Sequence, residues 1–264
     1  MAFSFAHISD HHLLHNEDEL KLGFSPGYAF RKVLQTIGNQ LAGEIDFLVS
    51  GGDLVETADF ESYEVAKRMM GLRAGDTAPG PGTLNAEGLE GLPIYFLPGN
   101  HDDRENFYRG LYPKQVSYGL MNVGFEHKGV QFLCLDLSPE VKGDMSDETF
   151  GSLSARLTDQ PTIILTHHPL VKVGAKWLDK YLADDLDRFW DFVSKKKVLA
   201  TLSGHVHISY EQEVRGVQVM GTRSTAFAFA PQDEKLICLW PPHIRVVTVD
   251  GERITSRLIE VPLD

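Results

Sequence analysis

Five apolar runs of this sequence each lead toward a short polar segment, and this repeated arrangement constrains the fold more than any other feature. The runs cover residues 3–8, 45–49, 93–97, 163–165 and 198–202. Continuous apolar runs of this length are typical of strands buried on both faces of a sheet. Residues 30–41, with apolar side chains every three or four positions, are typical of a helix between two such strands. Alternation of this kind predicts an α/β protein with parallel strands.

The polar segments contain the side chains that carry chemistry. They are Asp10-His11-His12, Gly52-Asp53, Gly99-Asn100-His101-Asp102, Thr166-His167-His168 and Gly204-His205-Val206-His207. Because strand ends in an α/β sheet line a common crevice, we expect these side chains to converge. So many ligands exceed the needs of one centre, which predicts two divalent metals. Imidazole with carboxylate favours Mn, Fe, Zn or Co over Ca or Mg.

The spelling and order of the five segments resemble the calcineurin-like metallophosphoesterase superfamily, whose pattern is D-x-H, G-D, G-N-H-D or G-N-H-E, H and G-H-x-H. The stretches "GGDLVET", "LPGNHDDR" and "THHPLVKVG" resemble its bacterial branch of class III cyclic nucleotide phosphodiesterases and glycerophosphodiesterases. Residues 221–225 also look like that branch, although the family usually has Pro where this chain has Arg223. The resemblance implies an α/β fold, namely a four-layer α/β/β/α sandwich of two mixed β-sheets flanked by helices.

The resemblance also implies seven metal ligands, assigned position by position. Asp53 would bridge the two metals, since a carboxylate has two oxygens. The other six ligands form one set for each metal: Asp10, His12 and His207 for the first, and Asn100, His167 and His205 for the second.

Further residues of the motifs have weaker assignments. His101 lies beside the phosphoryl group in the family, where it would protonate the leaving oxygen or stabilise developing charge. His11 and Arg223 are candidate substrate contacts, although His11 is equally suited to a packed position. Asp102 and Asp136 are expected to be structural or to orient a ligating imidazole.

The implied reaction is hydrolysis of small phosphodiesters, either a 3',5'-cyclic nucleotide or a glycerophosphodiester, with the attacking hydroxide generated at two metals. A phosphomonoesterase or a nuclease on the same scaffold is the alternative within hydrolases. A non-catalytic interaction scaffold is the alternative outside them, but such a protein would be expected to lose ligands, and this chain keeps all of them. The net charge of −12 argues against extended contact with nucleic acid.

The remaining features bound the organisation of the chain. We expect one domain over residues 1–264, a Gly/Pro-rich loop at 74–92 that stays away from the metals, and a β-rich part from about residue 208. Neither a targeting segment nor an apolar run of membrane length is visible, so we expect a cytoplasmic protein without membrane contact. Cys134 lies within an apolar run and is expected to be buried. The sequence leaves homo-oligomer formation open.

Overall fold

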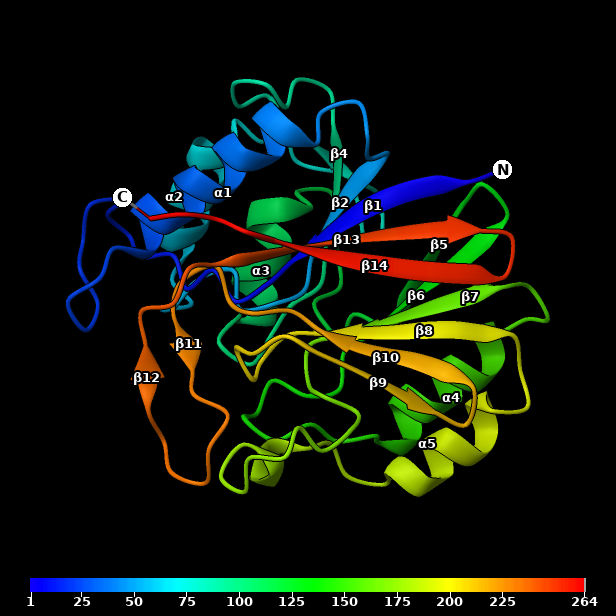
Figure 1. Ribbon diagram of the computed structural model, residues 1–264. Helices are drawn as coiled ribbons and strands as arrows, with labels where there is room; N and C mark the ends of the chain where they lie inside the picture. Colours follow the sequence, from blue (N-terminus) through cyan, green and yellow to red (C-terminus); the bar gives the residue numbers. More distant parts are fainter. Residues whose placement is uncertain (264) are drawn as a thin grey trace.

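The computed structural model describes residues 1–263 and contains two six-stranded β-sheets packed against each other (Figure 1). The first sheet has the strand order β14-β13-β1-β2-β4-β3. Its strands are β1 (Phe3–Ile8), β2 (Phe47–Ser50), β3 (Gly82–Thr83), β4 (Pro93–Phe96), β13 (His243–Asp250) and β14 (Arg253–Glu260). β1, β2 and β4 are parallel, whereas β3, β13 and β14 pair antiparallel. The sheet is therefore mixed, with its parallel strands in the middle.

The second sheet follows the same plan in the order β5-β6-β7-β8-β10-β9. Its strands are β5 (Val123–His127), β6 (Val130–Leu135), β7 (Thr162–Thr166), β8 (Val198–Ser203), β9 (Tyr210–Val214) and β10 (Val217–Gly221). Here β6, β7, β8 and β10 are parallel, and β5 and β9 are antiparallel edges. A separate two-stranded ribbon of β11 (Ala228–Phe229) and β12 (Ile237–Cys238) stands apart from both sheets in Figure 1.

Side chains that alternate along the central strands create the layers. In β1, Phe3 and Phe5 point into a core between the two sheets, while Ala6 and Ile8 belong to a core under the helices. In β6, Phe132 and Leu133 divide in the same way between the inner core and the outer one. Successive side chains of a strand point to opposite faces, so each central strand contributes to two cores. This is the expected four-layer α/β/β/α arrangement.

The helices cover the outer faces of the sheets, and four of the five α-helices among residues 1–263 begin at a side-chain cap. The helices on the first sheet are α1 (Pro26–Gln40), α2 (Phe60–Met70) and α3 (Arg104–Leu111), and those on the second are α4 (Asp147–Arg156) and α5 (Leu186–Val193). A short 3₁₀ turn, η1 (Asp179–Tyr181), precedes α5. Asp59 and Ser146, residue types that favour the N-cap position, accept hydrogen bonds from the first turns of α2 and α4. Among the described residues, no helix is both long enough and apolar enough to cross a bilayer.

The Gly/Pro-rich segment 74–92 is more structured than its composition predicts. β3 pairs with β4 and extends the first sheet, and Leu84 and Leu89 are buried in the core beneath the helices. The segment is therefore only in part the loop that its Gly and Pro content predicts. The reason is that Leu84 and Leu89 anchor the segment in the core, and the edge of β4 provides hydrogen-bond partners for β3. The strands beyond residue 208 are also not one unit, because β9 and β10 join the second sheet while β13 and β14 join the first.

Candidate metal centre

The polar segments meet where strands of both sheets end. Asp10, Asp53 and Asn100 follow β1, β2 and β4 of the first sheet, and His167 and His205 follow β7 and β8 of the second. Two groups of possible ligand atoms result, and the atoms within each group all lie within 4.8 Å of one another. The first group comes from Asp10, His12, Asp53 and His207, and the second comes from Asp53, His167 and His205. Asp53 belongs to both groups. The site is thus shared by the two sheets.

The backbone turns sharply at these positions. Nine non-glycine residues among residues 1–263 have positive φ, and five of them belong to the site: Asp10, His12, Asp53, His205 and His207. Non-glycine residues adopt this conformation rarely, and such positions cluster at functional sites. Glycines allow the turns to approach each other. A Cβ at Gly99 would collide with the Asp53 carboxylate, and a Cβ at Gly204 would collide with Ser9 and Asp10.

In the first group of ligand atoms, two imidazoles face each other beside two carboxylates. The Nε2 atoms of His12 and His207 are 3.1 Å apart. Asp10 Oδ1 is 3.4 Å from His207 Nε2, and Asp53 Oδ2 is 3.7 Å from His12 Nε2. These four side chains are almost fully buried.

The second group is arranged around His167. Its Nε2 lies 3.2 Å from Asn100 Oδ1, 3.3 Å from Asp53 Oδ2 and 3.3 Å from His205 Nδ1. The amide oxygen of Asn100 therefore adds a neutral donor to this group. The backbone N–H of His205 donates to Asp10 Oδ1 at 2.9 Å, which ties the second group to the first.

Hydrogen bonds at the far side of the imidazoles define which nitrogen faces inward. The Nδ1–H of His12 donates to Glu56 Oε2 at 2.8 Å. The same group of His167 donates to Gly51 O at 2.9 Å, and that of His207 donates to Phe227 O at 2.9 Å. In the neutral ring, the lone pair of each Nε2 then points into the site. Lone pairs and carboxylate oxygens thus converge, and this donor set fits divalent metals that accept imidazole and carboxylate.

The electrostatics of the site favour added positive charge. Burial lowers the pKa of His12 to about 3, which keeps this imidazole neutral. Burial also acts to lower the pKa of His167, but the Asp53 and Asp10 carboxylates outweigh it and raise that pKa to about 9. Although burial disfavours its charge, Asp53 has a pKa held well below its usual value by His167 and His12. The carboxylates therefore stay ionised and attract a cation.

His101 stands at the border between this centre and an open pocket. Its backbone N–H donates to Asp53 Oδ1 at 2.8 Å, and its Nδ1–H donates to the Glu56 carbonyl at 3.1 Å. His12, Glu56 and His101 also form a third group of possible ligand atoms. However, the Glu56 carboxylate already pairs with Lys21 and accepts from His12. We therefore assign this group to orientation of the two imidazoles.

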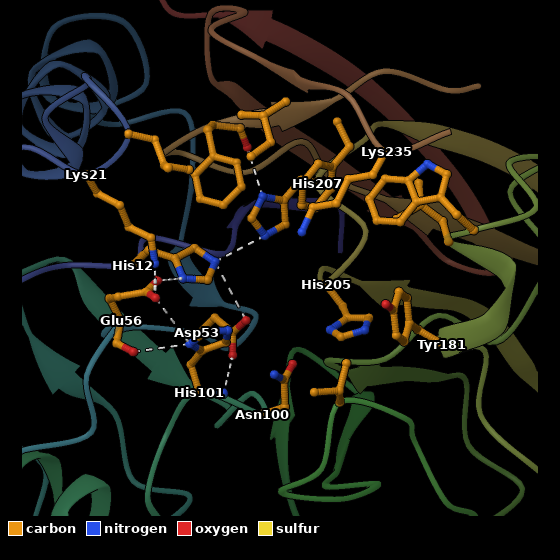
Figure 2. Close-up of a pocket in the computed structure, with 17 residues that line it drawn as sticks. His12, Lys21, Asp53, Glu56, Asn100, His101, Tyr181, His205, His207 and Lys235 are labelled. Carbon is orange, nitrogen blue, oxygen red and sulfur yellow. Dashed lines mark hydrogen bonds and ion pairs between the residues drawn. The ribbon is translucent and has the colours of Figure 1, made fainter. Parts of the chain in front are cut away.

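The pocket in front of the centre has a volume of about 250 Å³. One side consists of site residues, among them Asn100 and His205, and the other is aromatic and aliphatic (Figure 2). The aromatic side includes Trp177, Tyr181, Phe227 and Phe229. No residue of the described segment 74–92 lines this pocket.

Two of the expected substrate contacts are placed elsewhere. His11 is buried, and its ring nitrogens bond the hydroxyls of Thr225 at 2.7 Å and Ser50 at 2.9 Å. Arg223 donates to the Pro241 carbonyl at 2.8 Å and lies against the Trp240 ring. Neither residue lines the pocket, so the geometry gives no support to either as a substrate contact. His11 faces inward because it follows a strand end whose neighbours supply buried hydroxyls.

The carboxylates Asp102 and Asp136 have structural contacts and do not bond an imidazole. Asp102 accepts from the N–H groups of Gly99 (2.9 Å) and Leu54 (3.1 Å), joining the two loops that deliver Asn100 and Asp53. Asp136 forms a buried ion pair with Arg104 at 2.5 Å. Glu56 is the carboxylate that orients His12, and the sequence analysis missed it. Its position three residues after Asp53, in a motif loop, is the only signal for it.

Comparison with known proteins shows which protein family has this combination of motifs. The sequence profile of the calcineurin-like phosphoesterase family matches residues 3–209. A 3',5'-cyclic-nucleotide phosphodiesterase of Nostoc sp. is 27% identical over 88% of this chain and 82% of its own length. A glycerophosphodiester phosphodiesterase, GpdQ of Enterobacter lignolyticus, is 27% identical over 76% of this chain and 70% of its own length.

A solved structure agrees with the fold. A dimetal phosphatase from Danio rerio superposes with a TM-score of 0.63 at 14% identity, covering 98% of this chain and 99% of that one. At this identity the likeness concerns the fold alone. The match to the family profile covers most of the chain and includes all five polar segments. This chain therefore belongs to the calcineurin-like phosphoesterase family, in the branch that resembles the bacterial cyclic nucleotide and glycerophosphodiester phosphodiesterases.

Proposed function

We propose that this protein is a metal-dependent phosphodiesterase that hydrolyses small phosphodiesters, such as a 3',5'-cyclic nucleotide or a glycerophosphodiester. The observation that carries the proposal is the pair of ligand groups that share Asp53 and open onto one pocket. Relatives at similar identity bear the names of both substrate classes, so the substrate class stays open between these two.

The two groups support our assignment of ligands. Asp53 would bridge two divalent metals, with one set of residues for each: Asp10, His12 and His207, and Asn100, His167 and His205. Two metals held in this way supply Lewis acidity for the phosphoryl oxygens and an activated water as nucleophile. We propose that the two metals are drawn from Mn, Fe, Zn and Co.

The protein's own residues have distinct roles in the reaction. His101 is one-third exposed toward the pocket, and its Nδ1–H is held by the Glu56 carbonyl. Its Nε2 is therefore the atom that can deliver a proton to the leaving oxygen or stabilise charge there. Outer hydrogen bonds fix the imidazoles of His12, His167 and His207, so these donors are positioned before substrate arrives.

The alternatives receive less support. A nuclease would need a surface that attracts a long polyanion, whereas this chain has a net charge of −12 and a pocket of about 250 Å³. A non-catalytic scaffold would not need seven converging donors, three of them imidazoles whose outer hydrogen bonds fix the tautomer. A phosphomonoesterase differs from a diesterase only in the substrate, so experiment must separate these two.

The test compares a chromogenic diester, bis(p-nitrophenyl) phosphate, with the corresponding monoester. The protein is first treated with a chelator and then supplied with Mn²⁺, Zn²⁺ or Co²⁺. We expect metal-dependent release of nitrophenol with the diester as the better substrate, followed by activity on one of the two natural diester classes. Asp53→Ala is the control, because loss of the shared carboxylate should remove both metals and all turnover. Preference for the monoester, or diester turnover that persists in metal-depleted protein, would overturn the proposal.

A further inference from the structure

The β11–β12 ribbon presents one face to the pocket. Phe227, Phe229, Lys235 and Ile237 all line it, whereas the residues between them do not. Phe229 pairs with Ile237 across the ribbon, and side chains two positions apart in extended chain point to the same side. The ribbon thus supplies a mainly apolar wall that includes one lysine.

The ribbon is held against the opposite aromatic residue of the pocket. The Lys176 ammonium pairs with Asp233 at the ribbon's tip, and the Lys176 backbone N–H donates to the same carboxylate at 3.3 Å. Trp177, the next residue, then packs edge-on against Phe229 with ring centres 4.8 Å apart. Within the ribbon, the N–H of Ala230 donates to the Leu236 carbonyl at 2.9 Å. These contacts fix the turn that contains Lys235.

Lys235 extends from this turn over both rings. Its ammonium lies 5.8 Å from the centre of the Trp177 ring and 5.6 Å from that of Phe229. Figure 2 shows the side chain reaching into the pocket beside His207. Cation–π contacts of this kind orient an ammonium without neutralising it. No carboxylate among residues 1–263 forms an ion pair with Lys235, in contrast to Lys21 across the pocket, which pairs with Glu56.

Lys235 is exposed, so its oriented ammonium, which has no carboxylate partner in the described part of the chain, is available to bind an anion that enters the pocket. Lys21 also lines this pocket, and burial, together with a smaller effect of Lys235, lowers the pKa of Lys21 although Asp53 acts to raise it. The proposed substrate brings an anionic phosphoryl group to the same pocket. An ammonium donates to phosphate oxygens as a compact charge with three hydrogens.

We propose that Lys235 is a substrate-binding residue that contacts a non-bridging oxygen of the phosphoryl group held in this pocket. The proposal rests on the proposed phosphodiesterase function and adds a residue to it from outside the five motif segments. Lys235 would stabilise the bound anion, and the aromatic pair would hold the lysine stem in place.

The test uses three variants of the full-length, Mn²⁺-loaded protein. Lys235→Met keeps the stem that packs on the rings and removes the charge, and Lys235→Arg keeps the charge. Lys180→Met is the matched control, because Lys180 is an exposed lysine beside the pocket residue Tyr181 that does not itself line the pocket. Calorimetry with inorganic phosphate gives anion affinity, and elemental analysis gives metal content.

We expect Lys235→Met to weaken phosphate binding about tenfold, the usual loss for a hydrogen bond to a charged group. The value of kcat/KM for bis(p-nitrophenyl) phosphate should fall by a similar factor. Lys235→Arg should recover most of both, and Lys180→Met should match the wild type. Added salt should weaken phosphate binding to the wild type more steeply than to Lys235→Met.

The outcomes separate the two proposals. If the wild type hydrolyses no diester, the proposed function fails, while phosphate calorimetry still decides the role of Lys235. If Lys235→Met retains its metals and binds phosphate as tightly as the wild type, the lysine only packs on the aromatic rings and the inference is overturned. Circular dichroism of each variant checks that the fold is intact.

Discussion

Glu56 contacts three side chains that matter to the site. Its Oε2 accepts from His12, its carbonyl accepts from His101, and its Oε1 pairs with Lys21. A hydrogen bond to the outer nitrogen of a metal-binding imidazole fixes both the tautomer and the ring orientation. Glu56 therefore prepares a candidate ligand and a candidate proton donor at once, although it lies outside the seven assigned ligands.

Replacing Glu56 by Ala should lower metal affinity about 10–100-fold, the usual cost of losing such an outer hydrogen bond. The His12 Nδ1–H would lose its acceptor, and the ring would no longer be held with Nε2 inward. Lys21→Met is the matched comparison, because it removes the ion pair and leaves the bond between His12 and Glu56. Metal affinity can be measured by competition with a chelator. Equal losses in the two variants would show that the charge of the pair matters and the orientation of His12 does not.

The sequence predicts which residues meet in the site but not how each one is oriented. The positions of Asp10, Asp53 and Asn100 were predictable because each follows a buried strand, and the ends of such strands line a common crevice. Glu56 was not, since it is 44 positions from His12 and only the folded chain brings them together. For the same reason, adjacency could not decide the role of His11. Both of its neighbours belong to the site, yet its own ring faces buried hydroxyls.

Elements with a continuous apolar run were the ones the sequence could locate. β1 spans Phe3–Ile8 as predicted, and β8 extends the predicted run by a single residue. The β11–β12 ribbon was missed, because each strand has two residues and the turn between them is polar. α3 was also missed, although Asp103 caps it through the N–H of Asn106. Its apolar pattern is short, because the helix has only eight residues and begins directly after the motif Gly99–Asp102.

The segment 74–92 leads to a prediction with two parts. Leu84 is completely buried in the core, so Leu84→Ala should lower the free energy of unfolding by about 2–5 kcal/mol. The tip, residues 76–80, has few contacts to lose. Asp76 forms an exposed ion pair with Lys114, which contributes about 0–1 kcal/mol, and its carbonyl accepts from the Lys114 N–H at 2.9 Å. Ala78 is only partly buried against the core. Replacing the tip with a shorter Gly/Ser turn should therefore lower the free energy of unfolding much less than Leu84→Ala, by about 1 kcal/mol in urea unfolding.

Neither change should alter metal content or turnover of a small diester, because no residue of the segment lines the pocket. A fall in turnover after shortening the tip, with the unfolding midpoint preserved, would contradict this and connect the segment to the active site.

At the scale of the whole molecule, the site is one of several polar connections between two halves that also pack against each other. The first sheet supplies Asp10, Asp53 and Asn100, and the second supplies His167 and His205. Arg245 of β13 makes a second polar connection, since its buried guanidinium donates to Gly221 O of β10 at 2.9 Å and pairs with Glu211 of β9. A metal in the site would therefore hold both sheets together.

Metal binding should for this reason stabilise the whole molecule. A ligand that binds only the native state stabilises it by about 2.7 kcal/mol at a concentration of 100 Kd. For a chain of this size, that corresponds to a rise in Tm of roughly 5–10 °C. Calorimetric scans of chelator-treated protein, with and without added Mn²⁺, should show one transition whose Tm rises as a unit.

Asp53→Asn should lose this gain in Tm, because the carboxylate shared by both ligand groups is gone. Asp103→Ala, which removes a helix cap outside the site, should lower the Tm but keep the metal-dependent rise. Two separate transitions, with only one of them sensitive to Mn²⁺, would mean that the metals stabilise one sheet alone and that the site does not couple the two halves.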